Sequence, residues 1–340
     1  VGPIVLMPDI EKRHLATLFF GAFFGIASMA FVNVFNYSIC SALELPEDQF
    51  GRLAGSLTAV QEVVVVSVIG FFGALSDKVG RRIVYSMGFF LLGIGYFIYP
   101  LSDNMTELLF FRIFVALGCA ANTVMLPTVA NDYVHNSTRG RLIAFTSILN
   151  GLGLVLIIST FRNFATFYEQ LEAPEFLMNL GYDSANWAQY TFWSASAMVF
   201  IVSIVLYLNL KKGTAEATAK KDSYFSTLKV AIKEAKNPRV ALAYTAGIVS
   251  RGDLAVVSTF FALWLGIEFQ SLGMSKPEAQ KMAALLYVAV QACAIPGALL
   301  INFFIDKFDR VVALAISMAI AATGYLYLGF IDDVTGYQMY

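Results

Sequence analysis

The sequence GALSDKVGRR, residues 73–82, decides the fold because it is a short polar break that joins two long apolar runs, at 52–75 and 83–101. Its central pattern, Asp-Lys-x-x-Arg, begins at Asp77 and returns in DKFDR at 306–310, between apolar runs at 279–304 and 311–330. In each place the loop follows the second apolar run of its half of the chain. This recurrence predicts two related halves built from the same order of elements.

The rest of the chain is too apolar for a water-soluble globule. Its 340 residues are 58% hydrophobic and 14% charged, whereas soluble proteins carry about 25% charged residues. A formal net charge of −1 provides no basic field for nucleic acid, which excludes that class of partner. Three widely separated cysteines, and no His/Cys pattern with metal-ligand spacing, predict no disulfide, no metal site and no cofactor.

Nine apolar runs of about 20 residues each predict nine membrane-spanning helices. In lipid every backbone donor and acceptor must be satisfied within the protein, and the alternation typical of a barrel strand is absent, so the runs are expected to be helical. The fold class is therefore predicted as an all-α, polytopic membrane protein. The runs fall at 15–38, 52–75, 83–101, 107–130, 141–161, 188–210, 239–266, 279–304 and 311–330.

Lysine and arginine predict which side of the membrane each loop faces. Most of the 23 basic residues fall in segments that share one side if the N-terminus is cytoplasmic. Short loops rich in lysine and arginine stay in the cytoplasm. We therefore expect an integral, multi-pass protein of the inner or plasma membrane whose N-terminus is cytoplasmic.

The longest polar stretch, 211–238, divides the chain into two parts. We predict an N-terminal six-helix bundle at 1–210, a cytoplasmic linker at 211–238, and a partial C-terminal bundle of helices seven to nine at 239–340. Four apolar residues of the linker, at positions 224, 225, 228 and 232, fall roughly on one helical face, which predicts a short amphipathic helix at the membrane surface. A solvated linker with a helical tail fits the sequence as well.

The loop at 73–82 resembles the signature loop of the major facilitator superfamily, Gly-x-x-x-Asp-Arg/Lys-x-Gly-Arg-Arg/Lys, at every defining position. The run FRIFVALGCA is similar to the family pattern Arg-x-x-x-Gly-x-Gly, with Arg112 and Gly118 in place and Ala116 where glycine is usual. Arg139 and Gly140 fit the family's loop between helices four and five. The resemblance implies two bundles of six helices, so with nine runs we expect this chain to be part of a longer, twelve-helix transporter.

In that family the loop latches the cytoplasmic gate, which implies this role for five residues here: Gly73, Asp77, Gly80, Arg81 and Arg82. The family's aspartate faces the start of helix eleven. Its arginine faces an acidic residue at the end of helix four, for which Asp132 is the candidate. From the residues themselves, Gly73 allows close helix approach, Gly80 permits a tight turn, and the Asp77 carboxylate can bind N–H groups at a helix N-terminus. The alternative is that the basic residues only fix topology.

Ionisable side chains inside apolar runs are the candidate transport residues. Each costs about 2.5–3.5 kcal/mol at mid-membrane, so it faces a cavity or a partner. The family resemblance implies that Arg112 and Asp253 lie on helices that line a central cavity. Asp253 is our first candidate to carry a proton and Glu62 the second. Arg112 holds an anionic group of the substrate or acts as counter-charge to Glu62. For Glu62, for Asp253 and for its neighbour Arg251, a purely structural ion pair or contact is the alternative.

Together these features predict a secondary active transporter, not an enzyme. It would move a small organic solute by alternating access, coupled to protons, as a monomer in the lipid bilayer. A non-transporting membrane sensor or receptor on the same scaffold is the alternative, because a fold does not fix a function.

Overall fold

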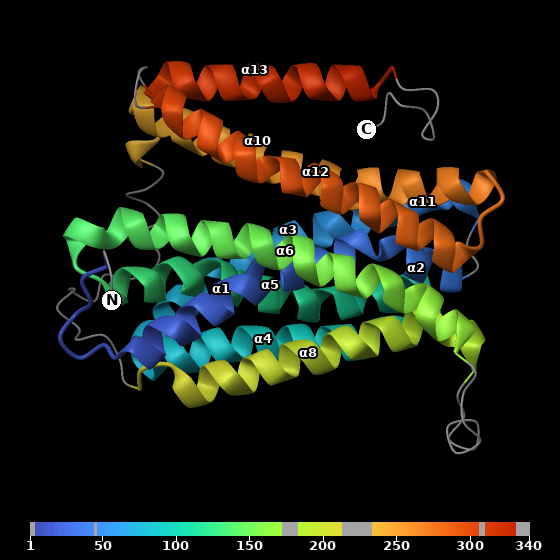
Figure 1. The fold of residues 1–340 in the computed structure, drawn as a ribbon, viewed down its shortest axis with the longest axis horizontal. Coiled ribbons are helices and arrows are strands. Elements are labelled where there is room, and N and C mark those ends of the chain that lie inside the picture. Colours follow the sequence, from blue (N-terminus) through green and yellow to red (C-terminus); the bar gives the residue numbers. More distant parts are fainter. Residues whose placement is uncertain (1–3, 44–45, 172–182, 213–232, 306–309, 331–340) are drawn as a thin grey trace.

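The computed structural model describes all residues except 1–3, 44–45, 172–182, 213–232, 306–309 and 331–340. The longer elements of the described part are all helical (Figure 1). In the N-terminal half these are α1 (Lys12–Val34), α2 (Asn36–Ala42), α3 (Glu47–Val79), α4 (Arg81–Ile98), η1 (Tyr99–Leu101), α5 (Met105–Tyr133), η2 (Asn136–Thr138), α6 (Arg139–Gln170), η3 (Ser184–Asn186) and α8 (Trp187–Asn209). The C-terminal part has α10 (Pro238–Ala255), the π-helical stretch η4 (Val256–Phe261), α11 (Ala262–Ser271), α12 (Lys276–Ile305) and α13 (Arg310–Leu328).

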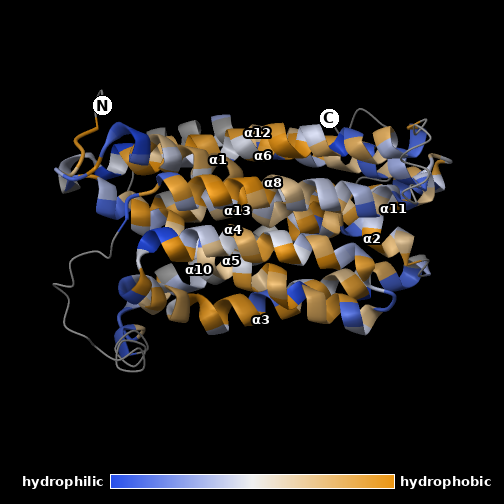
Figure 2. Cartoon of the chain, turned by 90° about the horizontal axis from the view of Figure 1, so that it is seen from below, coloured by the Kyte–Doolittle hydropathy of each residue, from blue (hydrophilic) through white to orange (hydrophobic). Residues whose placement is uncertain are grey.

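The predicted all-α, polytopic fold is confirmed. Within the described residues, six helical stretches, all before residue 210, are long and apolar enough to cross a membrane. The first predicted span is divided between α1 and α2, and the seventh between α10, η4 and α11. The last two predicted spans correspond to α12 and α13. Figure 2 shows the pattern that a bilayer imposes, since hydrophobic residues cover the middle of the helices and hydrophilic residues gather near their ends.

The helices of the N-terminal half pack side by side (Figure 1). α4 lies against both α5 and α8, α3 lies against α5, and α1 lies against α6. Across to the C-terminal part, α12 packs on α6, and α11 contacts α2. The predicted boundaries of the N-terminal bundle and of the partial C-terminal bundle remain expectations, and most of the predicted linker, at 213–232, lies outside the described residues.

A segment before α1 runs alongside the connection between α5 and α6. Its backbone pairs with that connection through Met7 N–H to Tyr133 O at 3.1 Å and His135 N–H to Val5 O at 3.1 Å. The Val5 N–H also donates to the Thr138 hydroxyl at 3.2 Å. The end of α5, which carries Asp132, and the connection that follows it are thus held by backbone hydrogen bonds to the segment before α1.

We expect Thr138→Val to loosen this pairing. The Thr138 hydroxyl is buried, accepts from Val5 N–H, and has the Val5 and His135 carbonyls within 3.3 and 3.4 Å as acceptors. Its loss should lower the free energy of unfolding by about 1 kcal/mol, seen as a lower thermal unfolding temperature in detergent. Thr160→Val is the control, because the exposed Thr160 hydroxyl donates only within its own helix, to Leu156 O. Equal unfolding temperatures for the two variants would contradict the expectation.

Candidate functional site

The Asp77 loop, residues 73–82, is a sharp corner between two long helices. α3 ends at Val79 and α4 begins at Arg81, so Gly80 alone turns the chain, with a φ of 99°. Residues with a side chain rarely adopt a φ in that left-handed region, which explains the glycine at this position. The sequence analysis expected Gly73 to allow close approach of two helices. In the structure a Cβ at this position would lie 3.9 Å from the Val124 side chain, an ordinary van der Waals contact, so the helix packing does not require glycine here.

Arg81 is the centre of the polar contacts at this corner. Its Nε donates to Asp132 Oδ2 at 3.0 Å, and its Nη1 lies 2.5 Å from Asp77 Oδ1. The same nitrogen donates to the Ser76 hydroxyl. The Arg81 side chain is 19% exposed, against 64% for Asp77 and 35% for Asp132. Three of the residues named from the sequence are therefore brought together, and they join the α3–α4 corner to the end of α5.

The remaining loop residues act elsewhere. The Arg82 guanidinium lies over the ring of Tyr207 in α8, 4.6 Å from its centre. The Asp77 carboxylate pairs with Arg81 in the structure. The contact that the family resemblance implies for Asp77, with the start of helix eleven, stays a prediction.

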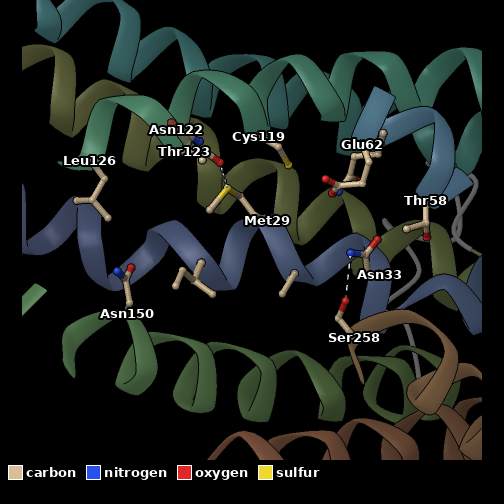
Figure 3. Close-up of a pocket in the computed structure, with 13 residues that line it drawn as sticks. Met29, Asn33, Thr58, Glu62, Cys119, Asn122, Thr123, Leu126, Asn150 and Ser258 are labelled. Atoms are coloured by element: carbon tan, nitrogen blue, oxygen red, sulfur yellow. Dashed lines mark hydrogen bonds between the residues drawn. The ribbon is translucent and has the colours of Figure 1, made fainter. Parts of the chain in front are cut away.

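A cavity of about 310 Å³ lies in the middle of the helices, enclosed by α1, α3, α5, α6 and η4 (Figure 3). Of the candidates named from the sequence, Glu62 lines it. Arg251 and Asp253 belong to α10, and their side chains lie outside the described part of the chain. The residues that line the cavity are Ile26, Met29, Ala30, Asn33, Thr58, Gln61, Glu62, Cys119, Asn122, Thr123, Leu126, Asn150 and Ser258.

Arg112 is fully buried behind the cavity wall rather than in it. Its Nη1 donates to the Tyr99 hydroxyl at 3.3 Å and its Nη2 donates to Asn33 Oδ1, while its buried Nε has no hydrogen-bond partner among the described residues. Asn33 in turn lines the cavity and donates through Nδ2 to the Ser258 hydroxyl of η4 at 3.4 Å. Asn33 thus links the buried guanidinium of Arg112 to the cavity, and this chain of hydrogen bonds ends at Ser258 in the C-terminal part.

The two parts of the chain also meet at the end away from the Asp77 loop. The Tyr37 hydroxyl donates to Gln270 Oε1 of α11. The Ser38 hydroxyl donates to Gln280 Oε1 at 3.1 Å, and Gln280 Nε2 donates to the Val34 carbonyl at 3.2 Å. Gln280 is completely buried. These hydrogen bonds join α1 and α2 to α11 and α12 on the far side of the cavity.

Sequence reasoning missed several wall residues. Gln61, Asn150 and Ser258 line the cavity although none was a candidate. Each is a single uncharged polar residue inside an apolar run, which is the signal available in the sequence. Such residues more often pair with a neighbouring helix than bind a ligand, so the signal alone does not select them.

Comparison with known proteins shows which family and which fold this chain resembles. The Major Facilitator Superfamily family model matches residues 15–340. Magnetosome protein MamH of Paramagnetospirillum magneticum is 24% identical over 299 residues, which covers 86% of this chain and 64% of that protein. A bacterial homologue of the human lysosomal transporter Spinster, in an inward-facing and unoccupied conformation, has a TM-score of 0.62 at 19% identity, covering 88% of this chain and 64% of that one. A D-xylose–proton symporter has a TM-score of 0.50 at 18% identity, covering 87% and 68%.

Proposed function

The chain belongs to the Major Facilitator Superfamily, and on that premise we propose that it works as a secondary active transporter of a small organic solute. The observation that carries this proposal is the central cavity, in which an acid, amides and hydroxyls from α1, α3, α5, α6 and η4 converge within otherwise apolar helices. Polar groups are costly at that depth unless they serve a partner or a ligand. A cavity of about 310 Å³ suits a small molecule.

Alternating access is the mechanism we infer for it. The hydrogen bonds of Tyr37 and Ser38 to Gln270 and Gln280 hold the two parts together at one end of the cavity. The Asp77 loop stands at the other end, where Arg81 pairs with Asp132. The first set of contacts joins the two parts of the chain, whereas the Arg81–Asp132 pair lies within the N-terminal part. For the cavity to open to one side at a time, contacts at its two ends must form and break in turn. We keep the sequence-based orientation for this mechanism, with the Asp77 loop and the N-terminus in the cytoplasm.

Thiol labelling tests transport without knowledge of the solute. In a chain whose other two cysteines are replaced by serine, Cys119 is the reporter, because it lines the cavity. We expect a membrane-impermeant thiol reagent to modify Cys119 in right-side-out vesicles and in inside-out vesicles. Labelling from one side only would contradict transport and would favour the alternative function, a sensor or receptor on the same scaffold.

Proton coupling is part of the proposal, with Asp253 of α10 as the first carrier and Glu62 as the second. Its support is the sequence, together with the structural likeness to a D-xylose–proton symporter. In proteoliposomes, Asp253→Asn is expected to abolish solute uptake driven by a pH gradient while exchange of solute across the membrane continues, because exchange requires no net proton movement. Riboflavin and D-xylose, which are the organic solutes named for proteins similar to this chain, are suitable first solutes. Unchanged gradient-driven uptake would remove Asp253 from the mechanism.

A further inference from the structure

We propose that Gln280 of α12 holds the first membrane span broken at Phe35, and that the break closes into one continuous helix when α12 moves away. Gln280 would then be a positioning residue of the transport cycle, because it sets the shape of a helix that lines the cavity. This inference rests on the proposed transport function, since it concerns the conformational change that transport requires. It is carried by a freed backbone carbonyl, by a break that the local sequence does not explain, and by a buried amide without a partner.

The break between α1 and α2 removes one hydrogen bond from the helix backbone. α1 ends at Val34 and α2 begins at Asn36, and Phe35 between them has a φ of −96° and a ψ of 15°, away from α-helical values. In an uninterrupted α-helix the Val34 carbonyl would accept from the Ser38 N–H. In the structure the Ser38 N–H donates to Phe35 O at 3.1 Å instead. The Val34 carbonyl is therefore open to a different donor.

Gln280 supplies that donor from the other part of the chain. Its Nε2 donates to the Val34 carbonyl at 3.2 Å, and its Oε1 accepts from the Ser38 hydroxyl at 3.1 Å. One side chain thus binds the last residue of α1 and the first turn of α2. Gln280 is completely buried, and a buried carbonyl needs a hydrogen-bond donor. Contact with α12 is therefore what makes the broken form of this helix acceptable.

The residues around the break do not explain it. Sharp bends in helices occur at proline, at glycine–serine pairs, at π-bulges, or where a side chain enters the backbone hydrogen bonds. The segment from Phe31 to Ser38, FVNVFNYS, contains neither proline nor glycine, and both flanking elements are α-helices. The cause that remains is the entry of the Gln280 side chain.

Asn36 favours a second conformation of this segment. It is the first residue of α2 and only 1% exposed, yet neither the oxygen nor the nitrogen of its amide has a hydrogen-bond partner in the described structure. A buried polar group without a partner destabilises the conformation that leaves it so. Withdrawal of Gln280 would allow the Ser38 N–H to return to the Val34 carbonyl, and the helix would then run on through Phe35.

Closing the break would change the wall of the cavity. Residues four apart lie on the same face of a helix, so a continuous helix aligns Tyr37 with Asn33, which lines the cavity. In the broken form the Tyr37 hydroxyl donates to Gln270 of α11 instead, and Tyr37 is not among the described lining residues. α2 lies beside both α11 and α12 (Figure 1). Movement of these two helices would in this way reach the solute site through the first span.

The test follows the backbone at Phe35 in Gln280→Met, which removes both hydrogen bonds of Gln280 with a side chain of similar length. Phe35 and Asn36 form the only Phe–Asn pair in the sequence. Protein labelled with ¹³C in the phenylalanine carbonyls and ¹⁵N in asparagine therefore gives a single correlated signal from this peptide bond in solid-state NMR of lipid-embedded samples. The carbonyl frequency of that signal reports whether Phe35 is helical.

We expect Gln280→Met to shift the Phe35 carbonyl signal to the higher frequency typical of helical residues. Ser38→Ala should leave the signal in place, because it removes one hydrogen bond of Gln280 and keeps the one to the Val34 carbonyl. Gln291→Met is the matched control on the same helix, since Gln291 donates only to Tyr287 of α12 among its printed contacts and should also leave the signal unchanged.

Gly266→Ala reaches the same question with Gln280 in place. A Cβ at Gly266 of α11 would lie 2.6 Å from the Tyr37 ring, so α11 has to move away from α2, and α12 packs on α11. We expect this variant to shift the Phe35 signal in the same direction. If Gln280→Met does not fold, Gly266→Ala decides in its place.

An unchanged Phe35 signal in folded Gln280→Met would overturn the proposal, as would an equal shift in Gln291→Met. Either result leaves the transport proposal standing if Cys119 is labelled from both sides of the membrane. Labelling from one side only contradicts transport, while the NMR signal, which needs no solute, still decides whether Gln280 holds the helix broken.

Discussion

Arg81→Gln is expected to raise the rate at which Cys119 is labelled from the side of the Asp77 loop by about fivefold. Arg81 is the residue through which Asp77, Ser76 and Asp132 are joined, so one substitution removes the ion pair between this corner and the end of α5. A fully exposed ion pair contributes little. The Arg81 side chain is only 19% exposed and binds two carboxylates, which gives its loss a larger effect.

The neighbouring arginine provides the matched control. Arg82 carries the same charge, but its guanidinium lies over Tyr207 rather than beside Asp132. If the basic residues only set topology, Arg81→Gln and Arg82→Gln should change labelling equally. If the loop is a latch, Arg81→Gln should increase labelling from its own side while Arg82→Gln leaves it close to the parent value.

Asp132→Asn and Asp77→Asn divide the effect between the two partners of Arg81. We expect Asp132→Asn to have the larger effect, because Asp132 is less exposed than Asp77 and its contact joins the α3–α4 corner to the end of α5. The Asp77 side chain is 64% exposed, and ion pairs of exposed side chains contribute at most about 1 kcal/mol. Identical labelling for the parent, Arg81→Gln and Asp132→Asn would reduce the loop to a topology signal.

The residues explain why the loop could be predicted and the cavity wall could not. Gly80 between two polar-flanked apolar runs indicates a turn, and the pairing of Arg81 with Asp132 is the contact that the family resemblance implied. Of the partners of Arg112, Tyr99 on η1 is 13 residues away in sequence, but Asn33 on α1 is 79 residues away. A membrane helix can be apolar on every face, so its pattern does not say which side chains point inward.

The π-helical stretch η4 further limits what the sequence can predict about the cavity wall. A π-helix has more residues per turn than an α-helix, so the face that Ser258 presents does not follow from counting along the sequence from Asp253. The contact of Ser258 with Asn33 therefore requires the structure. The helices and their order were accessible from hydropathy, whereas their rotation about their own axes was not.

The close packing of α1 on α6 could not be predicted from the sequence either. It leads to the prediction with the largest expected effect on stability. Gly153 of α6 is buried against the backbone of α1. A Cβ at this position would overlap the carbonyl oxygen of Phe23 and would lie 2.6 Å from its carbonyl carbon. These are backbone atoms, which no change of rotamer can move away. α1 and α6 would have to separate, and the cavity walls that carry Asn33 and Asn150 would separate with them.

We expect Gly153→Ala to destabilise the protein by about 3 kcal/mol or more, at the upper end for an overpacked core. Gly140→Ala is the control on the same helix, because a Cβ at Gly140 would meet no atom within 4 Å. Alanine is favoured over glycine in a helix by about 1 kcal/mol, so this control should unfold at the parent temperature or above it. The measurements are the monodisperse fraction after size-exclusion chromatography and the thermal unfolding temperature in detergent. If both variants unfold at the same temperature, α1 and α6 are not packed as closely as the structure has them, and the shape of the cavity between them would have to be revised.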